Sequence, residues 1–528
     1  MTPALPRGRN FAFLLPLVAV AALVIAARSR ALPLPLERDE GEYAYAGQLI
    51  LDGFAPFRLA YSVKLPGTSA VYAAIMAIFG ESPAGIHFGF LLINVAALIF
   101  LTLIALRVVG EKGAVVAGVS FALLSSSAGV LGLQGHATQL VAFFALAGIW
   151  AWFKARETKR QLWLLGSGLL FGLSFLCKQP GLFFGLFGGA MITIDALRQR
   201  SNLFAQLALY LTGLAAPYLI TCFLVWRSGT FETFWFWTVR YASMHAGLLT
   251  PATVLSHFLS FFQEIGIVNA ALPLAAVGLV CLFTSRHRGE SRIFLLMLLA
   301  FSWLAFCVSL YFMRHYFIMM VPVVSLLTAV AYNSLDAATP TPRWVSPACA
   351  AIAFAAYIVF NANIWFALPL DAVSRELYGN NPFLEAPAIG QLIQQSTPPD
   401  ARVAVFGSEP EILFYAHRRS ATGFIYMYDL VWRQKHAHDM QMQMIREIED
   451  AKPEFVVMVN VMPSWMFWHD SDTTIVSWGN DYVRRFYDDA GAVYIYPDHS
   501  EFATNAAAMK KNPDTPDLVL LYRRKPNT

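Results

Sequence analysis

Long apolar segments recur along most of the chain, and they constrain its fold more than any other feature. A helix needs about 20 apolar residues to cross the hydrocarbon layer of a membrane. The first 368 of the 528 residues contain such segments at close intervals, so the chain is predicted to be a polytopic α-helical membrane protein with about eleven transmembrane helices. The predicted helices are centred near residues 19, 97, 123, 146, 170, 189, 215, 275, 302, 324 and 356.

The composition agrees with this class and argues against others. Charged residues make up 14% of the chain and hydrophobic residues 57%, whereas soluble proteins carry about 25% charged residues. The net charge is only +4, and no basic stripe with interleaved aromatic residues indicates nucleic-acid binding. The five cysteines lie in or beside apolar segments and form no disulfide framework or metal motif.

The basic residues between the predicted helices predict the orientation of the chain. They fall at alternate ends of the helices and therefore on one side, which should be cytoplasmic. Residues 68–79 form a short apolar segment that would reverse all later loops if it crossed the membrane, so we expect a re-entrant or interfacial helix there. The N-terminus is then cytoplasmic, and residues 28–85, the first outer loop, lie outside.

The last part of the chain, residues 369–528, is predicted to be a separate soluble domain on the outer side. Its hydropathy is lower, and short strands alternate with helices, which is typical of a small α/β layer domain. Strands are predicted at residues 402–406, 454–460, 492–496 and 518–522, and helices at residues 436–451 and 473–487.

This domain shows no catalytic motif. Glu409, Glu411, Arg418 and Arg419 surround a predicted turn and could contact a sugar, but a solvated loop is the favoured interpretation. Because the domain is expected beside the first outer loop, we regard it as a platform for an acceptor molecule.

The first outer loop carries an unusual density of charge. Asp39, Glu40 and Glu42 are followed by Arg58 and Lys64, and charge kept beside a bilayer generally has a function. On a helix that starts near Asp39, Asp39 and Glu42 share a face and Glu40 points elsewhere. A carboxylate here can act as a general base, and the alternative is a helix cap formed by Asp39.

Further cations are expected on the outer side, against the positive-inside rule. They are Lys178 after the fifth predicted helix and Arg314 and His315 after the ninth. Each alone could be an interfacial side chain. Together with Arg58 and Lys64 they predict a site for the phosphate or pyrophosphate of a lipid, because such side chains pair with phosphate oxygens.

Three motifs in the predicted outer loops resemble those of GT-C glycosyltransferases. The similarity is to the bacterial branch related to protein O-mannosyltransferases and the aminoarabinose–lipid A transferase, and it covers roughly residues 10–335. The motifs are Asp39-Glu40-x-x-Tyr43 with Leu51-x-Gly53 and Lys64-x-Pro66-Gly67, then Lys178-x-Pro180, and then Arg314-His315-Tyr316 before a helix that contains Pro322.

The resemblance implies an inverting transfer of a sugar from a polyprenyl-phosphate donor to a hydroxyl of a periplasmic or outer-leaflet acceptor. Asp39 and Glu40 are the implied catalytic residues, with Asp39 taking the proton from the acceptor hydroxyl. Lys64 and the other outer cations would bind the donor phosphate, and Glu42 and Tyr43 would bind substrate. The protein would lie in a bacterial inner membrane with its C-terminal domain in the periplasm.

One feature departs from this pattern. Many relatives carry an acidic residue in the second outer loop, whereas residues 134–139 contain no carboxylate. His136 and Gln139 are candidate substrate contacts, and an ordinary polar turn is the alternative. Because no cluster of His, Asp and Glu is visible in the sequence, no required metal or other cofactor is predicted, and a divalent cation is left open.

Two other functions remain open. A transporter or flippase for lipid-linked sugars could use the same cations, although no internal repeat is present. A non-catalytic binding protein of the same fold is the third possibility. The expected partners are a polyprenyl-phosphate sugar, a glycan, lipid or protein acceptor and membrane lipids, without nucleic acid.

Overall fold

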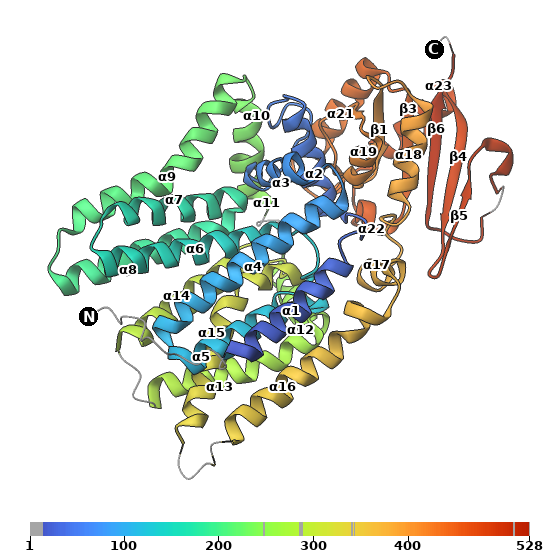
Figure 1. Ribbon diagram of the computed structural model, residues 1–528. Coiled ribbons are helices and arrows are strands. Elements are labelled where there is room, and N and C mark those ends of the chain that lie inside the picture. Colours follow the sequence, from blue (N-terminus) through green and yellow to red (C-terminus); the bar gives the residue numbers. More distant parts are fainter. Residues whose placement is uncertain are drawn as a thin grey trace.

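The protein consists of an extended bundle of helices with an α/β domain at one end, as Figure 1 shows. The computed structural model describes residues 14–245, 249–284, 289–338, 342, 344–510 and 513–526. The first element after the predicted domain boundary is α17, Leu370–Tyr378.

The polytopic helical prediction is confirmed, because each predicted membrane segment corresponds to a helix. Seven helical segments are long and apolar enough to cross a membrane, and they contain α4, α6, α8, α9, α13, α14 and α16. The helices are α1 Leu15–Arg30, α4 Pro83–Val108, α5 Gly110–Leu124, α6 Ala137–Thr158, α7 Leu162–Cys177, α8 Leu182–Gln199, α9 Leu203–Arg227, α13 Ala271–Thr284, α14 Gly289–Cys307, α15 Val321–Asp336 and α16 Val345–Ala362.

The remaining predicted spans, α1, α5, α7 and α15, have 15 or 16 residues. At about 1.5 Å per residue they fall short of a hydrocarbon layer of about 30 Å. Helices α5 and α15 pack against each other and are largely buried in the bundle, so their ends can be satisfied by protein rather than by lipid. The sequence did not predict the short helices between α9 and α13, which include α10 Phe231–Trp235 and α12 Pro251–Glu264.

Two shorter helices form the core of the first outer loop. They are α2, Arg38–Leu51, and α3, Gly67–Phe79, which pack against each other. Helix α2 begins with a reciprocal cap in which Glu37 accepts from the Glu40 amide and Glu40 accepts from the Glu37 amide. The alternative that Asp39 caps this helix is therefore wrong, and its carboxylate is free for other contacts.

The C-terminal domain is a mixed six-stranded sheet with helices, which confirms the α/β prediction. The strand order is β2-β1-β3-β6-β4-β5, with β2, β1 and β3 parallel and the other pairs antiparallel. The strands are β1 Arg402–Phe406, β2 Arg419–Ser420, β3 Phe455–Asn460, β4 Tyr487–Ile495, β5 Ser500–Ala503 and β6 Leu518–Arg524, and the helices include α18 Ala386–Ser396, α19 Pro410–Ala416, α21 Ala437–Ala451 and α23 Thr474–Phe486.

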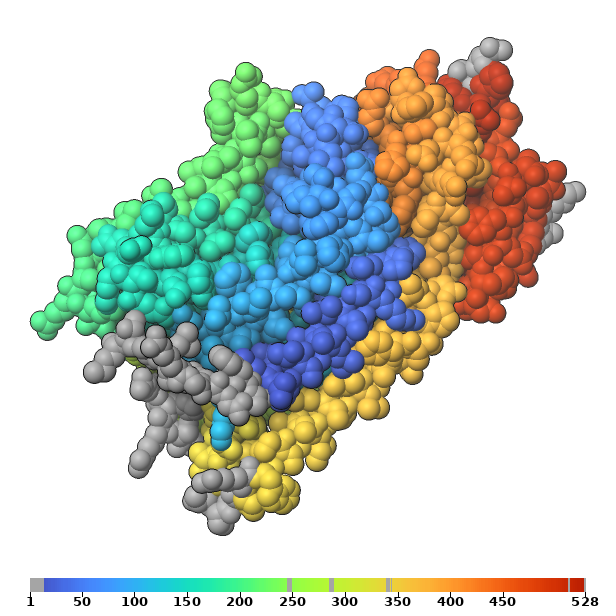
Figure 2. All heavy atoms as spheres, viewed as in Figure 1, coloured from blue at the N-terminus to red at the C-terminus, as the bar shows by residue number. Residues whose placement is uncertain are grey.

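The C-terminal domain packs directly on α2 through α19. Gly41 is required at this contact, because a Cβ there would lie 2.6 Å from the backbone nitrogen of Glu411. Glu409 and Glu411 are fully buried and Arg418 is 7% exposed, so the predicted solvated loop is wrong. Figure 2 shows the first outer loop, in blue, between the green α9–α10 segment and the orange part of the C-terminal domain.

Candidate active site

Asp39 and Lys64 form the centre of a charged cluster at the start of α2. The Lys64 Nζ lies 2.7 Å from Oδ1 of Asp39 and 2.5 Å from Oε2 of Glu42. The predicted common face of Asp39 and Glu42 is thereby confirmed. Tyr426 of the C-terminal domain donates from its hydroxyl to the same Oδ1, over 3.0 Å. The ring centre of Tyr43 lies 4.7 Å from the Nζ of Lys64.

Two histidines lie on the other side of Asp39. The rings of His136 and His315 are stacked, with their centres 4.3 Å apart, and His315 Nε2 is 3.9 Å from Oδ2 of Asp39. His136 precedes α6, and His315 lies in the 3-10 helix η7, Arg314–Met319. Both ring nitrogens of His136 are buried without a hydrogen-bond partner. Buried polar atoms are normally satisfied, so these nitrogens indicate a place for a ligand, water or ion.

Asp39, His136 and His315 together could hold a metal ion. One ligand atom from each residue lies within 4.8 Å of the others, and two imidazoles with one carboxylate suit a cation such as Zn²⁺. The orphan nitrogens of His136 fit this role. The sequence-based statement that no such cluster exists is corrected, because the three residues come from separate segments. That no metal is required stays a prediction.

The electrostatics of the cluster separate its groups into charged and neutral ones. Burial raises the pKa of Asp39, but the charge of Lys64 beside it, together with that of Lys178, holds this pKa well below its usual range. Burial lowers the pKa of Lys64, while Asp39 raises it well above its usual value. Burial lowers the pKa of His136 to about 4 and that of His315 well below its usual value. Near neutral pH, Asp39 and Lys64 are thus charged and both imidazoles neutral.

Lys178 supplies a second cation close to this cluster. It follows α7 and is only 8% exposed, with Nζ 4.2 Å from the ring centre of Tyr316. Among the described residues, no carboxylate forms an ion pair with it. A buried charge is costly without a partner, so Lys178 is suited to an anionic ligand.

Glu40 has a different environment from Asp39, as the helical spacing predicts. It is fully buried, and its Oε1 accepts a hydrogen bond from the Gly135 amide over 2.5 Å. The same oxygen lies 2.9 Å from Nε2 of His87 in α4. These contacts tie α2 to the loop between α5 and α6.

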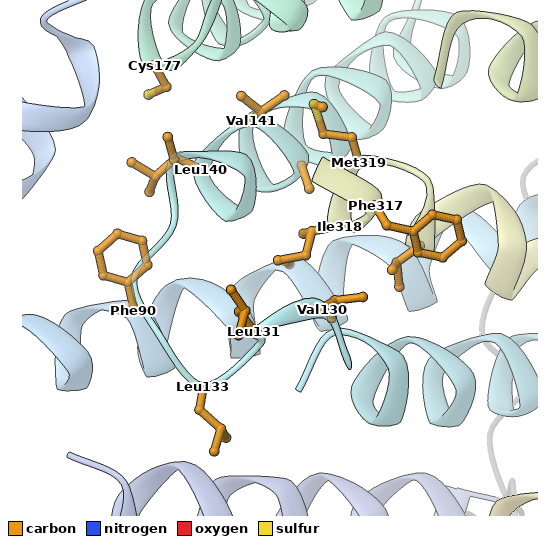
Figure 3. Close-up of a cluster of buried hydrophobic side chains, with 14 of the residues drawn as sticks. Phe90, Val130, Leu131, Leu133, Leu140, Val141, Cys177, Phe317, Ile318 and Met319 are labelled. Carbon is orange, nitrogen blue, oxygen red and sulfur yellow. The ribbon is translucent and has the colours of Figure 1, made fainter. Parts of the chain in front are cut away.

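The α5–α6 loop is braced by hydrogen bonds from the buried side chain of Gln139. Gln139 donates to the carbonyl oxygens of Gly132 and Gln134, over 3.1 and 2.7 Å, so its amide braces the loop that leads to His136. Figure 3 shows apolar side chains of this loop packed among α4, α6 and η7. The loop side chains are Val130, Leu131 and Leu133, and their neighbours are Phe90 of α4, Leu140 and Val141 of α6, and Phe317, Ile318 and Met319 of η7.

Two predicted phosphate ligands make their contacts elsewhere. Arg58 is exposed and donates to the Ser228 carbonyl oxygen over 2.9 Å. Arg314 donates to the Leu377 carbonyl oxygen over 3.1 Å, and its Nε is 3.8 Å from a carboxylate oxygen of Glu264. Among the described residues, neither guanidinium group contacts Asp39 or Lys64.

A pocket opens beside Glu42 and Lys64. Its walls are mostly apolar and come from α2 and from residues 54–66, with Ile425 of the C-terminal domain at its edge. The sequence did not identify Ile425 or Tyr426 as site residues, because their segment shows no motif and lies far along the chain from Asp39.

Comparisons with known proteins agree with this fold. Residues 64–226 match the family model described as dolichyl-phosphate-mannose-protein mannosyltransferase. No curated protein sequence matches the chain.

Solved structures with the same fold include a bacterial and an archaeal membrane enzyme. ArnT from Cupriavidus metallidurans, bound to undecaprenyl phosphate, is 15% identical with a TM-score of 0.55, over 85% of this chain and 94% of that one. The Archaeoglobus fulgidus oligosaccharyltransferase, tethered to an acceptor peptide, is 14% identical with a TM-score of 0.56, over 96% and 75%. The same enzyme in complex with Zn and sulfate is 14% identical with a TM-score of 0.53, over 94% and 74%. The predicted resemblance to the GT-C fold is thus confirmed.

Proposed function

We propose that this protein is an inverting glycosyltransferase that moves a sugar from a polyprenyl-phosphate donor to the hydroxyl of an acceptor. The observation that carries the proposal is the meeting of an ionised carboxylate, Asp39, with two cations, Lys64 and Lys178, at one site. Such a site combines a base for the acceptor with charges for a phosphate leaving group. The solved structures of this fold with undecaprenyl phosphate and dolichol-phosphate support a lipid-phosphate ligand.

Asp39 acts as the base through its Oδ2 atom. Oδ1 is occupied by Lys64 and Tyr426, while Oδ2 has His315 Nε2 at 3.9 Å and no hydrogen bond within the described part of the chain. Oδ2 accepts the proton of the acceptor hydroxyl as its oxygen forms a bond to the anomeric carbon. The bond from that carbon to the phosphate oxygen breaks, and its electron pair leaves with polyprenyl phosphate.

Lys64 and Lys178 hold the donor phosphate. Lys178 is buried without a carboxylate partner among the described residues, and Lys64 is placed to exchange its carboxylate partners for phosphate oxygens. Charge on these side chains stabilises the negative charge that develops on the leaving phosphate. We assign no phosphate contact to Arg58 or Arg314, whose guanidinium groups bind backbone carbonyls.

Glu40 is a positioning residue rather than a catalytic one in this proposal. Its buried carboxylate bonds to Gly135 and His87, so it fixes α2 relative to His136 without reaching the acceptor. Asp39, His136 and His315 would hold a divalent cation if one bound, and the cation would supply positive charge at Oδ2. Lys64 and Lys178 already provide the charge that the leaving group needs, so the proposed reaction requires no metal.

The active site is proposed to face the periplasm of a bacterial inner membrane. Arg107 lies in the last turn of α4, Arg156 in the last turn of α6 and Lys112 near the start of α5. These ends of the three helices lie away from α2 in Figure 1. Basic residues favour the cytoplasmic side. The C-terminal domain, beside α2, is then periplasmic.

The purified full-length protein tests the function directly. It is incubated in detergent with undecaprenyl-phosphate-linked hexoses or pentoses, labelled in the sugar, and with a bacterial envelope extract as acceptor. We expect labelled product together with an equal amount of undecaprenyl phosphate. Binding of the donors without release of undecaprenyl phosphate would contradict the proposal and favour a transporter or a binding protein.

A further inference from the structure

We propose that Tyr426, a residue of the C-terminal domain, is a positioning residue for Asp39, so that this domain completes the active site. The inference rests on the proposed function and goes further, because it makes the soluble domain part of the catalytic unit rather than only an acceptor platform.

Tyr426 restricts the rotation of the Asp39 carboxylate group by a hydrogen bond. Its hydroxyl donates to Oδ1 over 3.0 Å, and Lys64 donates to the same oxygen over 2.7 Å. The Tyr426 ring centre also lies 5.4 Å from the Lys64 Nζ. Two donors on Oδ1 fix the rotation of the carboxylate group and leave Oδ2 directed towards His315. A fixed lone pair is what a general base needs in order to meet an acceptor hydroxyl.

The segment that carries Tyr426 is anchored on both sides. The Gly423 carbonyl oxygen accepts from the Tyr61 amide of the first outer loop over 2.7 Å. The Met427 amide donates to Oγ of Ser408 over 2.9 Å. Tyr426 therefore lies between one contact to the membrane domain and one contact within its own domain, and its position depends on both.

Further contacts between α2 and the C-terminal domain flank Asp39. The Arg38 guanidinium lies 2.7 Å from Oε1 of Glu409, whose side chain is fully buried. The Nε of Arg38 also donates to the Ser408 carbonyl oxygen over 2.6 Å. About two turns further along α2, the Tyr45 hydroxyl accepts a hydrogen bond from the Ser420 amide over 2.8 Å. The Gly41 contact to Glu411 lies between these bonds. If the C-terminal domain moved away from α2, all of these contacts would break and Tyr426 would be withdrawn from Asp39.

Tyr426→Phe tests the role of the hydroxyl while keeping the ring. The matched control is Tyr428→Phe, two residues away, because the Tyr428 hydroxyl donates to the Pro463 carbonyl oxygen inside the domain over 2.7 Å. We expect Tyr426→Phe to lower kcat by about tenfold to hundredfold, with the KM and the affinity for the polyprenyl-phosphate donor unchanged. Tyr428→Phe should keep the wild-type kcat. An unchanged kcat for Tyr426→Phe would overturn the inference.

A thermal-unfolding cycle tests the contact without any turnover. The Tm of wild type, Asp39→Ala, Tyr426→Phe and the double variant is measured in detergent. If the two side chains interact, the two shifts in Tm are not additive. Additive shifts would overturn the inference. A wild-type protein that transfers no sugar would overturn the proposed function, and with it the catalytic role of Tyr426, whereas the cycle would still report the contact itself.

Discussion

The ammonium nitrogen of Lys64 lies 2.7 Å from an oxygen of Asp39, although the two residues are 25 positions apart. This pairing holds the pKa of Asp39 well below its usual range, against the effect of burial. A carboxylate of such low pKa is a weak base. In the proposed reaction, a donor phosphate that takes over Lys64 would let the pKa of Asp39 rise, so that donor binding prepares the base for the acceptor proton.

Replacing Lys64 should move the pH dependence of the reaction. The Lys64→Met variant lacks the charge that lowers the pKa of Asp39, so this pKa should be higher than in the wild type. The Asp39 carboxylate then becomes protonated at a higher pH as the solution is acidified. We expect the acidic limb of kcat/KM for the donor, which reports the free enzyme and is measured from about pH 5 to about pH 8, to shift to higher pH. Arg58→Met, which changes an exposed cation of the same loop, should keep the wild-type profile. An acidic limb that stays in place would disprove the coupling.

Removal of the Lys178 charge should weaken binding of the donor phosphate. A hydrogen bond to a charged group contributes about 1.5–3 kcal/mol, so Lys178→Met should raise the Kd for undecaprenyl phosphate by about tenfold to hundredfold. Lys510→Met, in the C-terminal domain, is the control and should bind normally. Isothermal titration in detergent gives both values, and equal affinities would remove Lys178 from the phosphate site.

Glu40→Ala should lower stability, because it leaves His87 and the Gly135 amide without their partner. Breaking a buried pair of this kind costs about 3–5 kcal/mol. Glu157→Ala breaks the surface pair with Arg107 and should cost about 0–1 kcal/mol. Denaturant unfolding in detergent compares the two free energies. Equal losses would show that Glu40 does not anchor the α5–α6 loop.

Zn²⁺ should inhibit the enzyme through the group formed by Asp39, His136 and His315. A cation held there would be bound by the carboxylate of Asp39, the proposed proton acceptor. We expect turnover to be unchanged by EDTA and lowered by micromolar Zn²⁺ more strongly than by Mg²⁺, which prefers oxygen ligands. His136→Phe keeps the ring and should relieve the inhibition. If EDTA abolished turnover and Zn²⁺ restored it, the metal-free mechanism would be wrong.

The helical spacing of the first outer loop predicted a large part of the site. Asp39 and Glu42 are three positions apart on α2, so their common face follows from local geometry. Strand β1 likewise has the predicted bounds, 402–406, because Val403 and Val405 are β-branched and Phe406 is aromatic. Strand β5 was not predicted, because it has only four residues, of which Glu501 and Phe502 are exposed, and they lack the alternation that marks a buried strand.

Contacts between distant segments were not predictable from one sequence. The stacking of His136 on His315 depends on two loops that are brought together by helix packing. The polar residues Glu409 and Glu411 suggested a solvated loop, but α19 packs on α2 and Arg38 neutralises Glu409. Tyr426 reaches Asp39 from 387 positions away, and only the docking of the two domains makes it a neighbour.

The most direct test of the central claim is sugar transfer by Asp39→Asn. The amide keeps the size of the side chain but cannot act as a general base, so transfer from a labelled polyprenyl-phosphate donor should fall by about 10²–10⁴-fold. Asp52→Asn, at the exposed end of α2, serves as the control and should transfer at the wild-type rate. If folded Asp39→Asn protein transferred sugar as fast as wild type, Asp39 would not be the base.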